Sequence, residues 1–301
     1  MTIGSEAPAV SDAVAAGDSV AAFERARAAA LRAKRLQAGL GGLCFLAALA
    51  ASIEVGEVSL ATLVDGLPGF GNYLNDIAPR LRGDHLAADL AEWYWDLGRW
   101  LGLLWDTVLI AFAGTLLGIA GALLLCFPAS GNLQDNRWIY FAARRLAEVA
   151  RAVPELVYAL IFVFAFGLGP LAGALAIAVH SAGALAKLFS EVNENVAPGP
   201  IEGVRAAGGG WLQGIRYGVI PQVLPDYLSY GLLRFEINVR SASVIGFVGA
   251  GGIGQELMFV IREFIYTDVS AIVILILLTV SIIDISCERL RHRLIGREAP
   301  A

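Results

Sequence analysis

Charged side chains are scarce in this sequence: Asp, Glu, Lys and Arg make up 16% of its 301 residues, whereas 57% are hydrophobic. A soluble globular protein of this length carries more charge and less apolar surface. The composition therefore places the chain among membrane proteins. A formal net charge of −5 also lacks the basic excess that phosphate backbones require, so we expect no nucleic-acid partner.

Several catalytic and structural signatures are missing as well. The cysteines Cys44, Cys126 and Cys287 show no Cys-x-x-Cys spacing, and we interpret them as small apolar residues. The sequence has no Gly-rich phosphate loop ending in Lys-Ser/Thr, no His-Glu-x-x-His motif and no evident nucleophile–base pair. These absences argue against an intramembrane enzyme, and we expect this chain to bind no metal or cofactor itself.

Apolar runs near the length of ~20 residues that a bilayer requires recur six times. They cover residues 38–53, 101–127, 146–166, 174–189, 226–247 and 269–287. Basic residues precede the first run and follow the second and the sixth, as is typical of cytoplasmic flanks. The start of the chain lacks the basic patch and apolar core of a secretory signal. The sequence therefore predicts an all-α polytopic protein with six spans and both termini in the cytoplasm.

This topology divides the chain into four parts. They are a cytoplasmic tail (1–36, the first 24 or so expected to be mobile), a first span with an extracytoplasmic elbow (37–100), a transmembrane domain (101–293) and a cytoplasmic tail (294–301). Aromatic residues cluster just before the second run, at Trp93, Tyr94, Trp95, Trp100 and Trp105. Such rings gather at a membrane–water boundary, although ordinary packing in a helix core also explains the cluster.

A moderately polar segment, residues 198–225, separates the fourth and fifth runs, and we name it the coupling loop. Pro200 favours a first helical turn, and Gly208 begins a run of three glycines that is expected to end that helix. A second short helix is predicted from Trp211 to Val219, ending at Pro221. Two short helices joined at a glycine corner form a compact unit, and such a unit suits a groove in another protein.

The spacing of Glu202, Gly208 and Pro221 resembles the "EAA" cytoplasmic loop of ABC-importer permeases, with Gly203 and Val204 in place of its two alanines. Longer strings resemble the phosphonate-importer permease (PhnE) family over roughly residues 101–293. Among them are Val153-Pro154-Glu155-Leu156, Arg234-Phe235-Glu236, Asn238-Val239-Arg240-Ser241-Ala242 and Val248-Gly249-Ala250-Gly251-Gly252-Ile253-Gly254.

This resemblance implies the permease subunit of an ATP-driven phosphonate importer in the bacterial cytoplasmic membrane. Two such chains would form the pore, two ATPase subunits carrying ATP and Mg²⁺ would hold the coupling loops, and an extracytoplasmic binding protein would deliver the substrate. ATPase coupling is assigned to Ile201, Glu202, Gly203, Val204, Gly208 and Pro221, with Ile201 and Val204 expected on one face. The alternatives are an importer for phosphite, phosphate or another small oxyanion and, from another class, an ion-coupled secondary transporter.

The fifth run is interrupted by Arg234, Glu236, Asn238 and Arg240. Each charge near a helix centre costs about 2.5–3.5 kcal/mol on insertion scales, whereas each Leu, Ile or Val returns only about 0.3–0.6 kcal/mol. The span must therefore face protein or water. Glu236 and Arg240 lie four residues apart and can form a structural ion pair.

Arg234, Asn238 and Ser241 fall on a largely opposite face of the same helix. They offer a cation, an amide and a hydroxyl without an acid, which suits an oxyanion in transit. Alternatively, Arg234 pairs with a carboxylate of another span, such as Glu155 or Glu191, and fixes the helix bundle. The pair His180-Ser181 in the fourth run is either a polar patch on the same path, or His180 is a neutral interior histidine whose hydrogen bonds are satisfied.

The string from Gly249 to Gly254 matches the G-x-G-x-x-G dinucleotide pattern. The preceding run has a helical rather than a strand pattern, and Asp268 precedes another apolar run instead of ending a strand. We therefore interpret these glycines as a tight outer turn or a flexible loop, at the start of an outer loop that reaches Asp268.

Overall fold

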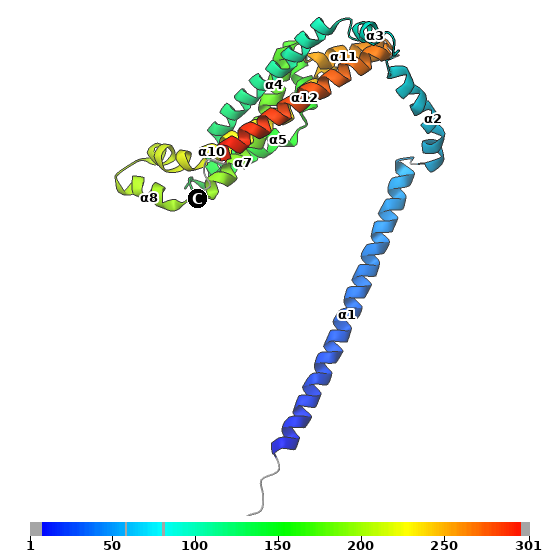
Figure 1. Ribbon diagram of the computed structural model, residues 1–301. Helices are drawn as coiled ribbons and strands as arrows, with labels where there is room; N and C mark the ends of the chain where they lie inside the picture. The colour runs from blue at the N-terminus through cyan, green and yellow to red at the C-terminus, as the bar shows by residue number, and fades with distance from the viewer. Residues whose placement is uncertain (1–7, 58, 80–81, 296–301) are drawn as a thin grey trace, which may run out of the picture. The chain divides into compact units, whose positions relative to one another are not determined.

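The computed structural model describes residues 8–57, 59–79 and 82–295, and all regular structure over these residues is helical (Figure 1). The chain divides into two compact units, Met1–Tyr73 and Leu74–Ala301. Four described helices are long and apolar enough to cross a membrane, and the number rises to six if each of two bent helix pairs is one span. The predicted all-α polytopic fold with about six spans is confirmed.

The first helix is longer than predicted. Helix α1 runs over Pro8–Val55, and its segment Ala30–Val55 can span a membrane. We expected a mobile tail over about the first 24 residues, but the backbone is helical from Pro8 onward. The segment before the apolar run is rich in alanine, which has the strongest helix propensity, so the helix extends past the run.

Helix α2, Leu60–Ile77, follows in the segment that we predicted as an elbow. It contains Pro68 and the glycines Gly66, Gly69 and Gly71. The structure describes every residue of this helix, and none of them is buried. Three glycines and one proline together disfavour a helix by roughly 6 kcal/mol relative to alanine. An 18-residue helix with that handicap is not stable alone in water, so α2 requires a surface to lie against.

The second unit is built around α4, Leu97–Cys126, and α7, Pro170–Glu194. Small residues let the two backbones approach closely, as is typical of helix contacts in membranes. A Cβ added at Gly114 would lie 2.7 Å from Ile177 Cγ2, and one added at Gly118 would lie 2.7 Å from Ser181 Cβ. The contact therefore depends on glycine at these positions.

The variant Gly118→Val is expected to destabilise the permease by about 1–3 kcal/mol, because the side chain cannot fit against Ser181 without moving α7. Gly102→Val is the matched control, since a Cβ at this exposed position of the same helix meets nothing within 4 Å. Thermal unfolding of the purified protein in nanodiscs measures both. Equal midpoints for the two variants would contradict a close α4–α7 contact.

The third predicted span, residues 146–166, is wrong as one straight helix. The structure has α5, Arg137–Ala152, and α6, Glu155–Phe166, which meet at 88°. Between them, Val153 is extended (φ −79°, ψ 127°), as expected for a residue before proline, whose ring excludes the helical region. Pro154 thus ends α5, and the basic residues that follow the second apolar run belong to this helix.

The coupling loop also differs from the prediction at its C-terminal end. It contains α8, Pro198–Ala206, the short α9, Trp211–Gln213, and a π-helical segment, Gly214–Val219, which continues into α10, Ile220–Ile245. The helix therefore does not end at Pro221. In the preceding widened turn the N–H of Ile220 bonds Ile215 O, and proline is tolerated in the first turn of α10 because it needs no N–H there.

The predicted outer loop up to Asp268 is wrong, because it contains α11, Ile253–Arg262, before the last helix α12, Tyr266–Ile295. Ile253, Leu257 and Val260 recur at helical spacing and are buried, which explains the helix. Only a short 3₁₀ turn, Gly246–Val248, and the glycines after it separate α10 from α11, and the axis bends there by 46°.

The glycine turn before α11 is closely packed. Gly249, Gly251 and Gly252 all have positive φ (83°, 84° and 74°), a region that side chains disfavour. The N–H of Gly169, between α6 and α7, donates to Gly249 O at 3.0 Å, so two glycine turns meet here. Within the second unit, Figure 1 shows α8 at one end of the helices and α3, Leu86–Trp93, with α11 at the other.

Candidate functional site

The coupling loop is held to the spans by Gln222, in the first turn of α10. Its Oε1 accepts from Ala197 N (3.1 Å), and its Nε2 donates to Ala197 O (3.3 Å) and to Gly218 O (2.6 Å). These bonds fix the start of α8 against the start of α10. The signal for this clamp in the sequence is an amide, which both donates and accepts, directly after Pro221.

The glycine corner of the loop forms as predicted. Gly208 has φ +84°, and the N–H groups of Gly208 and Gly209 bond Arg205 O and Val204 O, both at 2.9 Å, so the last carbonyls of α8 are satisfied. The indole N–H of Trp211 donates to Leu133 O at 2.7 Å. The corner is thereby tied to the turn between α4 and α5.

The predicted coupling residues divide into a buried and an exposed group. Ile201 is 8% exposed and belongs to the chain's own core, where a Cβ at Gly218 would lie 3.0 Å from its Cα. Our expectation that Ile201 faces a partner is thus corrected: it packs α8 onto the spans. Val204 is half-buried against Gly209. The exposed coupling residues are Glu202, Gly203, Gly208 and Pro221.

The polar residues of α10 meet the bend between α5 and α6. Arg234 Nη2 lies 2.6 Å from Glu155 Oε1, and both side chains are nearly buried, at 12% and 13% exposure. His180 of α7 donates from Nδ1 to Val153 O (3.0 Å), and its Nε2 lies 3.7 Å from Glu155 Oε1. The helix break at Pro154 is therefore held by the charged and polar groups of α7 and α10.

A second set of bonds joins α4, α7 and α10. Ser181 Oγ accepts from Arg234 Nε and from Asn238 Nδ2, both at 3.0 Å. Asn238 Nδ2 also donates to Thr115 Oγ1 at 2.8 Å, and the hydroxyl of Thr115 donates to Ala111 O at 2.6 Å. Asn238 and Ser181 have no exposed surface, so they lie in the contact between the three helices.

The structure separates the other predicted residues of α10 from this cluster. Ser241 is half-buried one turn further along, and no bond to the cluster is found for it among the described residues. Arg240 Nη2 lies 2.5 Å from Glu236 Oε1, as the four-residue spacing suggested, and 3.7 Å from Asp284 Oδ1 of α12. The pair also contacts the last helix, which the sequence did not indicate.

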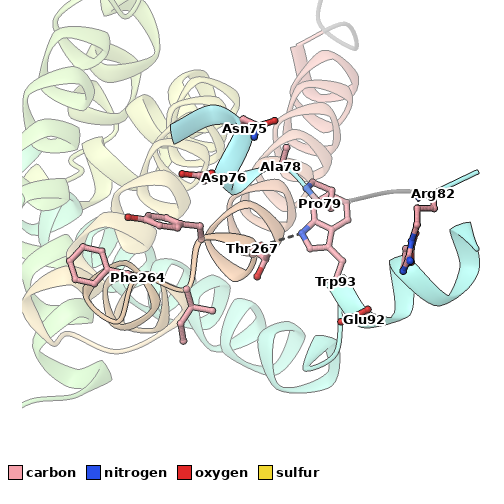
Figure 2. A pocket seen from close by; sticks show the side chains of 12 residues that line it. Asn75, Asp76, Ala78, Pro79, Arg82, Glu92, Trp93, Phe264 and Thr267 are labelled. Carbon is pink, nitrogen blue, oxygen red and sulfur yellow. Dashed lines mark hydrogen bonds and ion pairs between the residues drawn. The ribbon is translucent and has the colours of Figure 1, made fainter. Parts of the chain in front are cut away.

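At the opposite end from the coupling loop, a recess of about 930 Å³ opens beside α3 and the start of α12 (Figure 2). The indole N–H of Trp93 donates to Thr267 O and Ser270 Oγ, both at 3.1 Å. Asp89 Oδ2 accepts from the backbone N–H of Arg82 (2.7 Å), and this bond, with that from the Arg82 side chain, lowers the pKa of the Asp89 carboxyl.

The aromatic cluster is divided between the core and the surface of the second unit. Trp100 is 1% exposed and packs in a core with Leu104 and Ile253, whereas Trp95 and Trp105 remain about two-thirds exposed. Trp95 also donates from Nε1 to Asp268 Oδ2 at 3.2 Å. The rings on this end thus include one ordinary core residue and two surface residues at the start of a span.

An all-helical membrane chain with a polar loop clamped between two spans has the features of a permease, the class of membrane protein that forms a transport path. The chain belongs to the family of binding-protein-dependent transport system inner membrane components, which matches residues 114–297. This family is the transmembrane component of such transport systems. Membership speaks against the ion-coupled secondary transporter and against an intramembrane enzyme.

Two relatives agree with this family, and one solved structure shares the fold. The phosphite transport system permease protein PtxC of Stutzerimonas stutzeri is 36% identical over 82% of this chain and 86% of its own length. A protein of Escherichia coli named as a cryptic phosphonate transport system permease, PhnE2, is 51% identical over 40% of this chain and 99% of its own. An inward-facing MetNI methionine ABC transporter matches 65% of this chain and 95% of its own, with 21% identity and a TM-score of 0.55.

Proposed function

We propose that this chain is the permease subunit of an ATP-driven importer of phosphonates. The names of the two relatives support a small phosphorus oxyanion as substrate. Phosphite is the second candidate, because the relative named for it matches most of the chain. The observation that carries the proposal is family membership together with the coupling loop clamped to α10 by Gln222.

The chain would obtain its energy from partners. Separate ATPase subunits, which hold ATP and Mg²⁺, would bind the exposed residues of the coupling loop around Glu202 and Gly208. A second copy of the chain would complete the pore, and an extracytoplasmic binding protein would deliver the substrate. We place both termini and the coupling loop in the cytoplasm of a bacterium, with the complex in its inner membrane, as the arginine distribution favours.

For the translocation step, we propose that Arg234 alternates between Glu155 and the substrate anion. The guanidinium is paired with Glu155 at the bend between α5 and α6, and an oxyanion is a competing partner of the same charge and geometry. Binding of the anion would release Glu155, and with it one of the contacts that hold the bend. Asn238 and Ser181 would orient the guanidinium through Ser181 Oγ.

The proposal is tested with the permease purified together with its ATPase and binding protein in nanodiscs. We expect methylphosphonate or phosphite, added with the binding protein, to stimulate ATP hydrolysis several-fold, whereas sulfate should not. The permease alone should hydrolyse no ATP. Stimulation by methionine but by no phosphorus oxyanion would refute the substrate class, and ATP-independent uptake by the lone chain would refute the importer mechanism.

A further inference from the structure

Helix α2 has two chemically distinct faces. Six of its large apolar side chains lie within an arc of about 120° on one side of the helix. They are Leu60, Leu63, Val64, Leu67, Phe70 and Leu74, and each is between 46% and 75% exposed. Asp65, Asn72 and Asp76 lie on the opposite side. The helix is therefore amphipathic, and none of the residues on its apolar face is buried.

The chain holds both ends of α2 close to the ends of spans. Leu60 follows the spanning segment Ala30–Val55 after four residues, which reach at most about 18 Å. At the other end, Asn75 and Asp76 belong to the second unit and line the recess with Trp93 and Thr267 (Figure 2). Thr267 lies in the first turn of α12, which is itself a spanning helix.

The apolar face carries no charged residue. The opposite face carries two acids, Asp65 and Asp76, and the amides Asn72 and Asn75 lie on this face or at its edge. This pattern is that of helices that lie in the membrane interface, with the apolar side buried at the headgroup–acyl boundary. A surface of this kind also explains how a helix with Pro68 and three glycines is stable although none of its residues is buried. A water-exposed elbow would leave six large apolar side chains in solvent.

We infer that α2 lies flat on the membrane leaflet opposite the coupling loop, with Leu63, Leu67 and Phe70 inserted between the lipids. One end of α2 follows a spanning segment after four residues and the other lines a recess with the start of α12, so a bilayer surface is within reach of the helix. The helix thus anchors the connection between the first span and the rest of the permease. This inference rests on the membrane-spanning assignment of α1 and α12 and is independent of the transported substrate.

Site-directed spin labelling tests this placement. The full-length permease, with its three native cysteines replaced, is reconstituted in nanodiscs of phosphatidylethanolamine and phosphatidylglycerol. Leu67→Cys labels the apolar face and Asp65→Cys is the matched polar-face control two residues away. Phe70→Cys and Asn72→Cys form a second matched pair. Collisions with oxygen, which concentrates in lipid, and with a water-soluble nickel chelate are measured at each position.

We expect labels at residues 67 and 70 to favour oxygen over the nickel chelate by several-fold, and labels at 65 and 72 to show the reverse. Equal access of the chelate to all four labels would overturn the inference by placing α2 in water. Labels at 67 and 70 that are immobilised and reached by neither reagent would also overturn it, because a protein, such as a second copy or the binding protein, would then cover the face. Neither outcome bears on ATP-dependent uptake, which is measured separately.

Discussion

Replacing Gly208 with proline is expected to separate ATP hydrolysis from transport. Gly208 has φ +84°, and its N–H bonds Arg205 O, whereas proline fixes φ near −65° and has no N–H. The corner between α8 and α9 would therefore lose its geometry, while the spans, which do not depend on it, should still insert. We expect uptake to fall by roughly 5- to 150-fold, the range of effects to which typical coupling free energies between two sites correspond. ATP hydrolysis should be largely retained.

Gly208→Asn is the matched control for this experiment, because asparagine tolerates positive φ better than other side chains and a Cβ here meets nothing within 4 Å. It should retain most of the uptake. Glu202→Ala tests the exposed surface of α8 instead of its shape and should also lower uptake relative to hydrolysis. Normal uptake by both Gly208→Pro and Glu202→Ala would contradict the coupling role of the loop.

The second large effect is expected at the ion pair of Arg234 and Glu155. Arg234→Ala leaves a nearly buried carboxylate without its cation, and removing one partner of such a pair typically destabilises a protein by about 3–5 kcal/mol. We expect a lower unfolding temperature in nanodiscs together with loss of substrate-driven uptake. Basal ATP hydrolysis should fall less than uptake, because Arg234 does not contact the coupling loop.

The double variant Arg234→Ala/Glu155→Ala distinguishes transport from packing. Removing both charges leaves no unpaired group, so stability should recover most of the loss, while uptake should remain low if the guanidinium meets the anion. Arg234→Lys, which keeps the charge but not the planar fork, should retain part of the uptake. A double variant with normal uptake would show that the pair serves only to hold the bend.

Hydropathy alone predicted where the membrane helices lie, because the thickness of a bilayer fixes the length of an apolar run. It could not show that one of these runs is broken. Residues on both sides of Pro154 are apolar enough to be read as one span, and only the restriction on Val153 by the following proline reveals the bend. In the same way, the glycines after Val248 concealed the helical pattern of α11.

Proline was a less reliable signal at the coupling loop. Pro221 was expected to end a helix, but the π-helical segment before it widens the turn, and the helix continues. Such a segment depends on packing against Ile201, which lies far away in the loop, and therefore has no local signature. The same non-local packing buries Ile201, which the sequence pattern had placed on one face with Val204 and which we had assigned to ATPase coupling.

At the polar cluster, helical periodicity correctly grouped Arg234 with Asn238 but could not choose their partners. Glu155 and Glu191 were both offered as acids, and the structure places Glu155 at the guanidinium. Thr115 accepts a hydrogen bond from Asn238. The sequence did not indicate this partner, because a threonine in an apolar run carries no pattern that distinguishes it. Contacts between helices far apart in sequence are the part of this site that one sequence does not contain.

The continuity of the helix through Pro221 has a mechanical result. Helical structure extends without a loop from Trp211 to Val248, through the π-helical segment and past Pro225, so one continuous run of helix connects Trp211 with Arg234. We expect a movement imposed on the coupling loop to be passed along this helix to Arg234 and to change the distance between its guanidinium and Glu155. A movement made at the coupling loop would then become a change of electrostatic neighbour at the bend between α5 and α6.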